Sequence, residues 1–301
     1  MSQSIGRSIV AFDRNSNKSV VFRATDGHLV AAYTGHAYLD GIPTDTFIAE
    51  SLLGVNLSKP GGFFGVGHPA SWTDVGRSVE RLRGNLSAAF QRMPESDRAI
   101  DFQVSVLGWR QRRARNRRVT PVIWELRRSE LRGEIFQIFR HQRWWRWDQS
   151  FTTTTVPDLG RNPILDWMRA ELREFGAKSP DEVKRIIVEG LRRCAEERPQ
   201  TVGRSCLQIV LTPAVAPHVR IRYILDTCSP TDLTPDGVGY SPWIVAPPMA
   251  YAPAVIGGGG GGFTNTATGY QWVLEGVAPP PGPKRFSQSS QRRSSDPRKR
   301  R

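Results

Sequence analysis

The sequence predicts a layered α+β domain, because its expected elements come in blocks and not in a regular strand and helix alternation. Strands are expected first, followed by two helices, more strands, two further helices and a last set of strands. A hydrophobic content of 39% over 301 residues is enough to form a core, which excludes a chain disordered throughout and a disulfide miniprotein. We expect a single domain over residues 1–277.

The first block begins with a β-hairpin. Ser19–Phe22 and Leu29–Thr34 are short β-type runs, and Asp26-Gly27 between them is a typical turn signal. These two strands are therefore expected to pair in an antiparallel manner.

Two helices are expected next. The first begins at Thr44 or Asp45, since both residue types are favoured N-caps, and it ends at Gly54. The second covers Thr73–Met93, where apolar residues recur along one helical face and Thr73 or Asp74 caps the start.

The later elements follow from the same kinds of pattern. Alternation predicts a strand at Phe102–Val106, a second strand is indicated at Val122–Leu126, and Arg110–Arg118 connects the two as a hairpin loop. Helices are expected at Pro163–Phe175 and Ser179–Glu197. The last strands are expected at Cys206–Leu211, Val219–Leu225, Trp243–Val245 and Tyr270–Leu274.

The net charge of +14 is concentrated in two segments. Residues 109–147, which include the expected basic hairpin, hold twelve Arg against three Glu. Residues 284–301 hold eight basic residues and one Asp. The Pro-, Ser- and Arg-rich segment 278–301 cannot bury enough apolar surface to fold, so it is expected to be a disordered basic tail.

The first basic segment interleaves arginine with tryptophan, a combination that suits nucleic acid. Arginines can contact phosphates while tryptophans stack on bases. A solvated hairpin loop, with tryptophans that cover a sheet edge or pack on the core, explains the same residues, so both interpretations stay open. The candidate nucleic-acid-binding residues are Arg110, Arg112, Arg113, Arg115, Arg117, Arg118, Trp144, Trp145 and Trp147.

The run Val30–Gly41, followed by a helix from Thr44, resembles the proteasome β-subunit pattern, in which a strand ends in a turn with Gly and Asp and leads into the first long helix. Thr201–Cys206 is similar to the point where that fold returns from its helices to its second sheet. The resemblance implies the four-layer αββα sandwich of the N-terminal nucleophile hydrolases, with two antiparallel sheets between helical layers.

That family hydrolyses peptide or amide bonds with an N-terminal Thr, Ser or Cys whose own α-amino group is the base. The resemblance implies Ser2 as the nucleophile once Met1 is removed, with Asp13 and Lys18 as the Asp and Lys that follow it. Asp13 and Lys18 are only five residues apart, so the first hairpin is expected to be too short or missing. An active hydrolase, a degenerate relative and a non-catalytic scaffold all stay open.

No cofactor or metal is expected, because the five histidines and three cysteines show no metal-ligand spacing. The cysteine pattern and an N-terminus without a signal-like apolar run favour a cytoplasmic location. Prolines and glycines interrupt the uncharged stretch 237–274, so no membrane-spanning helix is expected. A homo-oligomer, or an anionic partner bound by the basic loop and tail, stays open.

Overall fold

The structure is a computed structural model. It describes residues 2–5, 8–11, 18–54, 64–66, 73–111, 119–129, 135–140, 163–174, 180–197, 206–212, 218–224, 239–240, 242–246, 249–251, 255–256, 261–265 and 270–274. The tail at 278–301 lies outside these residues.

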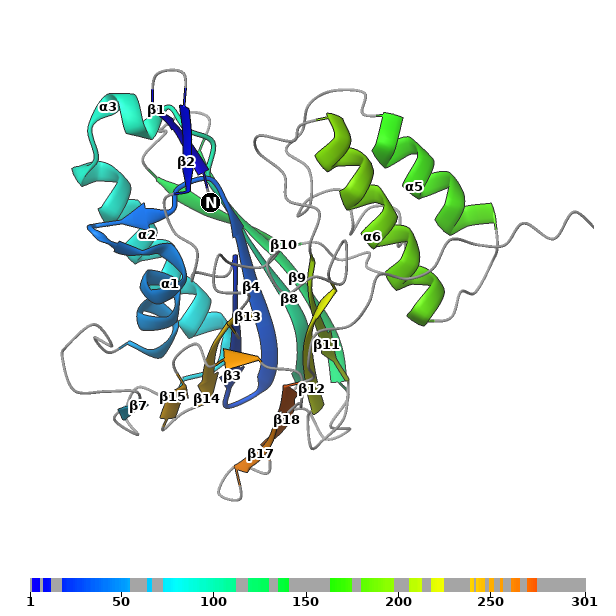
Figure 1. Ribbon diagram of the computed structural model, residues 1–301. Coiled ribbons are helices and arrows are strands. Elements are labelled where there is room, and N and C mark those ends of the chain that lie inside the picture. Colours follow the sequence, from blue (N-terminus) through cyan, green and yellow to red (C-terminus); the bar gives the residue numbers. More distant parts are fainter. Residues whose placement is uncertain are drawn as a thin grey trace, which may run out of the picture.

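The chain has a mixed α+β fold whose largest sheet contains eight strands, in the order β10-β9-β8-β4-β3-β14-β15-β7 (Figure 1). The strands of this sheet are β3 (Ser19–Ala24), β4 (Gly27–Thr34), β7 (Phe64–Val66), β8 (Gln103–Gln111), β9 (Val119–Arg128), β10 (Phe136–Arg140), β14 (Trp243–Ala246) and β15 (Met249–Tyr251). The expected β3–β4 hairpin and the β8–β9 hairpin are both confirmed.

A second sheet has four strands in the order β11-β12-β18-β17. Its strands are β11 (Cys206–Leu211), β12 (His218–Ile224), β17 (Gly261–Asn265) and β18 (Tyr270–Leu274). Three short pairs complete the described strands: β1 (Ser2–Ile5) with β2 (Ser8–Ala11), β5 (Tyr38–Leu39) with β6 (Ile42–Pro43), and β13 (Gly239–Tyr240) with β16 (Val255–Ile256).

The expectation of two purely antiparallel sheets is wrong. β14 pairs parallel to β3, with Ile244 opposite Val21, and β12 pairs parallel to β18, with Val219 opposite Trp272. Strands joined by a tight turn must run antiparallel, whereas partners separated by a long connection are free to align. Both parallel pairs are of this second kind, so each sheet is mixed.

The helices match the expected segments closely. They are α1 (Thr44–Leu53), α2 (Val75–Arg92), the short α3 (Glu95–Arg98), α5 (Pro163–Glu174) and α6 (Pro180–Glu197). The Asp74 side chain caps α2 by accepting a hydrogen bond from the Arg77 backbone N at 3.0 Å, as predicted.

The expected N-cap of α1 is wrong. Pro43 occupies this position without a side-chain cap, because the Thr44 hydroxyl donates instead to the His36 carbonyl at 2.9 Å. At the other end, Gly54 ends α1 in the left-handed conformation, as predicted.

One face of the large sheet carries α1 and α2. Val20, Phe22, Val104 and Leu126 from the strands share a buried core with the apolar faces of both helices. Phe90 of α2 packs against Phe102 and Phe136 at ring-centroid distances of 5.3 and 4.9 Å. Burial of this apolar surface holds the helices on the sheet.

The opposite face of the large sheet meets the second sheet. Val21 and Ile244 pack there with Val219 and Ile221 of β12. On the second sheet, Cys206 and Ile224 pack with Val188 of α6. Figure 1 shows α1 and α2 on one side of the strands and α5 and α6 on the other. No helix in the described part of the chain is long and apolar enough to cross a membrane.

Candidate functional site

The first candidate nucleophile lies in a hairpin at the N-terminus. Ser2 is the first residue of β1, and its backbone is opposite Ala11 of β2. This β1–β2 hairpin has four residues in each strand and precedes Asp13, whereas the hairpin expected between Asp13 and Lys18 falls on residues 12–17, outside the described part of the chain. The Ser2 side chain and all of Asp13 lie outside the described residues, so the structure gives no distance from either to Lys18.

Lys18 immediately precedes β3, at the start of the large sheet. Its carbonyl accepts a hydrogen bond from the Tyr33 backbone N at 3.0 Å, which extends the β3–β4 pairing by one residue. Lys18 is exposed at the surface, and partial desolvation by the surrounding residues lowers the pKa of its ammonium.

A buried polar row crosses the large sheet directly beside Lys18. Ser19 is opposite Ala32, Ala32 is opposite Ser105, and Ser105 is opposite Glu125. The three polar members are exposed by only 7%, 3% and 1%. They lie on the sheet face that also carries Val21 and Val30, which is the face that meets the second sheet.

The polar row has unequal hydrogen bonding. The Ser19 hydroxyl has no hydrogen-bond partner among the described residues. Ser105 Oγ accepts from Gln103 Nε2 at 3.5 Å, and Glu125 Oε2 is 3.2 Å from Arg127 Nε. A buried hydroxyl without a partner loses its hydration without compensation, which is uncommon in folded proteins.

Sequence reasoning missed this row. Gln103 and Ser105 form the polar half of an alternating strand, which is the pattern of a sheet with one solvated face. The second sheet covers that face, and it is formed by residues about one hundred positions later in the chain. A Glu inside an otherwise apolar strand run, Val122–Leu126, is the signal that could have identified the row.

Arg110, one of the predicted nucleic-acid-binding residues, makes a structural contact and keeps 37% of its side chain exposed. Its Nε donates to Asp26 Oδ2 at 2.6 Å. Asp26 is buried, and its Oδ1 accepts from the Val75 backbone N at 2.8 Å. Asp26 therefore links the β3–β4 turn both to the start of α2 and, through Arg110 Nε, to the end of β8.

The other predicted nucleic-acid-binding residues lie outside the described residues. Those are Arg112, Arg113, Arg115, Arg117, Arg118, Trp144, Trp145 and Trp147.

Arginine and aromatic side chains do meet at the nearby strands β9 and β10. The Arg127 guanidinium lies 4.5 Å from the Phe139 ring centroid, and that of Arg140 lies 5.0 Å from the Trp124 ring centroid. Because β10 runs antiparallel to β9, Arg140 at the end of β10 lies near the start of β9. The basic loop ends where β9 begins. Cation–aromatic stacking of this kind is available to a nucleotide base as well.

The described residues contain no group of three or more His, Cys, Asp or Glu side chains that could hold a metal ion. Comparisons with protein-family models, with curated proteins and with solved structures found no match.

Proposed function

We propose that the chain adopts the four-layer αββα arrangement of the N-terminal nucleophile hydrolases and hydrolyses a peptide or amide bond with Ser2. The observation that supports this best is the order of packing, with α1 and α2 against the large sheet, that sheet against β12, and the second sheet against α6. The short hairpin that carries Ser2 adds support, because it precedes the large sheet in the chain.

In the proposed reaction the Ser2 Oγ attacks the amide carbonyl carbon. The free α-amino group of Ser2 accepts the hydroxyl proton and passes it to the departing amine as the carbon–nitrogen bond breaks. An ester of Ser2 remains, and water hydrolyses it to release the acid and restore the hydroxyl. The Lys18 ammonium and the Asp13 carboxylate would stabilise charge beside the reacting groups.

Covalent labelling of the full chain tests this mechanism. A peptidyl epoxyketone should bond to both the hydroxyl and the α-amino group of Ser2, so that mass spectrometry finds Met1 removed and the adduct on the N-terminal peptide. Ser2→Ala should abolish the adduct, Ser2→Thr should retain it, and Ser4→Ala, a matched change in the same strand, should leave it intact. A mature protein that retains Met1 would exclude this mechanism.

Nucleic-acid binding is the second candidate function, favoured by the stacked Arg127–Phe139 and Arg140–Trp124 pairs. Binding to single-stranded RNA should weaken steeply with salt, because each phosphate contact releases counterions. Arg140→Gln should weaken the gel shift, whereas Arg110→Gln should not, since Arg110 is held by Asp26. Gel shifts that show no complex at low salt would eliminate this function.

A further inference from the structure

The outer edge of the large sheet exposes an aromatic ring. Phe139 of β10 is 37% exposed, although the second sheet packs on this same face of the large sheet. The large-sheet residues in that contact belong to β3, β4 and β14, and β10 lies three strands away from β4. Three strand spacings amount to roughly 14 Å, so the contact between the sheets does not reach the β10 edge.

Polar side chains share this face with Phe139. Phe139 is opposite Glu125 of β9. Gln137 is opposite Arg127, which is in turn opposite Gln103 of β8. Because residues two apart in a strand lie on the same face, all five side chains are on one side of the sheet. Gln137 and Arg127 are exposed, whereas Glu125 is buried.

Two of these neighbours hold Arg127 in place. Its guanidinium lies 4.5 Å from the Phe139 ring centroid, and its Nε is 3.2 Å from Glu125 Oε2. The Arg127 side chain is nevertheless 48% exposed. The carboxylate compensates part of the arginine charge, so the Arg127–Phe139 pair offers a flat stacked surface rather than a strong phosphate contact.

Positive charge surrounds this surface. Arg140 follows Phe139 in the chain and lies on the opposite face of the sheet, where its guanidinium is 5.0 Å from the Trp124 ring centroid. Residues 109–147 hold twelve Arg against three Glu, and one of those three, Glu125, is the residue beside Arg127. This charge balance favours an anionic partner at the sheet edge.

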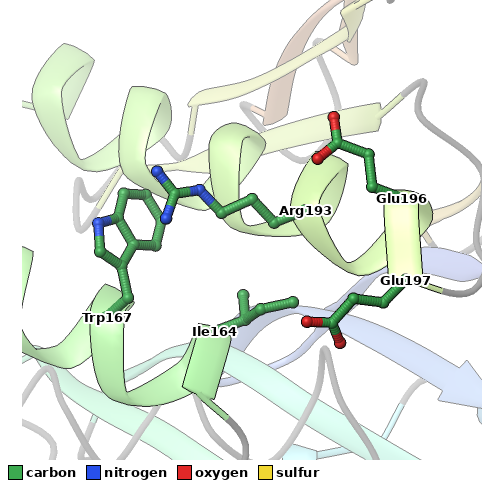
Figure 2. A pocket seen from close by; sticks show the side chains of 5 residues that line it. All are labelled: Ile164, Trp167, Arg193, Glu196 and Glu197. Atoms are coloured by element: carbon green, nitrogen blue, oxygen red, sulfur yellow. The ribbon is translucent and has the colours of Figure 1, made fainter.

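A second arginine–aromatic pair, between α5 and α6, has different surroundings. The Arg193 guanidinium lies 3.7 Å from the Trp167 ring centroid, and its Nε donates to Glu189 Oε1 at 3.2 Å. Figure 2 shows Arg193 directed toward Trp167 in a pocket that Glu196 and Glu197 also line. Three carboxylates on this part of α6 repel a phosphate chain, so this pair serves as a comparison.

A ring combined with a guanidinium and amides suits a nucleobase. Unpaired bases stack on aromatic rings and on guanidinium planes, and amide groups form hydrogen bonds with their edges. An acidic peptide supplies the negative charge but no flat ring to stack on this surface. Bases within a duplex are already stacked on one another, so a single strand fits best.

We propose that the β9–β10 edge binds a single-stranded nucleic acid, with one base stacked on the Arg127–Phe139 pair beside the Gln137 amide. Arg140 contacts the phosphate backbone from the other side of the edge strand. This inference rests on the second candidate function, nucleic-acid binding, and it adds a base contact to the phosphate contacts.

Two strands with the same number of phosphates test the base contact. One is a short single-stranded RNA, and the other has the same sugar–phosphate backbone without bases. Fluorescence anisotropy over a range of salt concentrations measures the affinity of the full chain for each. We expect the RNA to bind at least about fivefold more tightly, which is the effect of one stacked base. Single-stranded DNA of the same sequence distinguishes the two kinds of nucleic acid.

Variants locate the base contact. Phe139→Leu should remove the preference for bases without changing the salt dependence, because no phosphate contact is lost. Phe139→Tyr should retain the preference. Arg140→Gln should lower the salt slope by about one and keep the preference. Two controls should change neither quantity: Val210→Ala, which alters an apolar side chain of 39% exposure on β11, and Arg193→Gln.

The outcomes separate this inference from the function on which it rests. The absence of any complex at low salt would eliminate nucleic-acid binding itself. Equal affinity for the two strands, or a Phe139→Leu variant that still prefers bases, would overturn the base site while phosphate binding remains. Binding of polyglutamate as tight as that of RNA would show that the surface recognises charge alone, and would overturn the base site as well.

Discussion

Asp26 and Arg110 form a hydrogen-bonded ion pair between Oδ2 and Nε at 2.6 Å, across 84 positions of sequence. The same carboxylate accepts the Val75 backbone N–H, and the Asp26 carbonyl accepts the Gln111 backbone N–H at 2.6 Å. One turn residue thus connects β3, β4, β8 and the start of α2. The turn at Asp26-Gly27 and the start of the basic segment 109–147 meet in this contact.

Replacement of Asp26 by Ala should lower the free energy of unfolding by about 2 to 4 kcal/mol, because it leaves the buried Val75 N–H without an acceptor and Arg110 without its partner. Asp26→Asn keeps an acceptor for Val75 and should cost less. Urea unfolding of the two variants beside Arg110→Gln measures the difference. Equal losses for Asp26→Ala and Asp26→Asn would contradict the role given to the Val75 hydrogen bond.

The Asp26 contact shows what the sequence can and cannot predict. The turn at Asp26-Gly27, the cap at Asp74 and the stop at Gly54 are local signals, and all three have their expected positions. The partner of Asp26 is far away in the sequence, and no local pattern identifies Arg110. A guanidinium in a run of arginines looks the same whether it is exposed or held by a buried carboxylate.

The order of the strands in each sheet cannot be predicted from the sequence for the same reason. The parallel pairing of β14 with β3 joins residues more than two hundred positions apart, and short apolar runs give no direction for such a pairing. The candidate site is the part that the sequence predicts least well, because the burial of Ser19, Ser105 and Glu125 depends on coverage of one sheet face. Ser2, Asp13 and Lys18 follow from the family resemblance alone, and they stay predictions.

Gly35 should tolerate no side chain. Its φ is +101°, and a Cβ there would overlap the Asp101 carbonyl oxygen and the Phe102 ring. Gly41 is a matched control, since its φ is +78° but no atom lies within 4 Å of a built Cβ. We expect Gly41→Ala to cost about 1 to 2 kcal/mol from the left-handed backbone alone, and Gly35→Ala about 2 kcal/mol more from overlap. Thermal and urea unfolding measure both, and similar costs would contradict the close approach.

His28 should make the fold less stable in mild acid. Burial lowers the pKa of His28 below its ordinary 6.5, and the charge of Arg23 lowers it further. The hydrogen bond to the Thr212 carbonyl raises the pKa and opposes these two effects only in part. As pH falls below about 6.5, the unfolded chain binds a proton that the folded chain does not, so stability is lost. One such group changes stability by at most about 1.4 kcal/mol per pH unit.

His28→Gln offers a direct comparison for this pH effect, because the glutamine amide can still donate to Thr212 but does not titrate. The variant should show a shallower loss of stability between pH 7.5 and 5 than the natural chain. His36, whose pKa burial also lowers, stays in both proteins and gives the same background. Parallel stability curves from urea unfolding would show that His28 contributes no such linkage.

Arg81 should be coupled energetically to Gly54. Arg81 Nε donates to the Ser51 carbonyl at 2.8 Å and its second terminal nitrogen donates to the Leu52 carbonyl at 2.6 Å, so the guanidinium caps the end of α1. A Cβ at Gly54 would meet that guanidinium. Arg81→Ala should cost about 2 kcal/mol through the lost charged hydrogen bonds, whereas Arg77→Ala, which removes an exposed side chain on the same helix, should cost less than about 1 kcal/mol.

The double variant separates the two effects at Gly54. In the natural chain, Gly54→Ala carries the cost of a left-handed alanine together with the displacement of Arg81. In the Arg81→Ala background only the backbone cost remains, so the second substitution should be less harmful by about 1 kcal/mol, the size of coupling that contacting residues usually show. Urea unfolding of the natural chain, the two single variants and the double variant completes this double-mutant cycle. Strict additivity would mean that α1 ends independently of Arg81, with its last carbonyl groups hydrated.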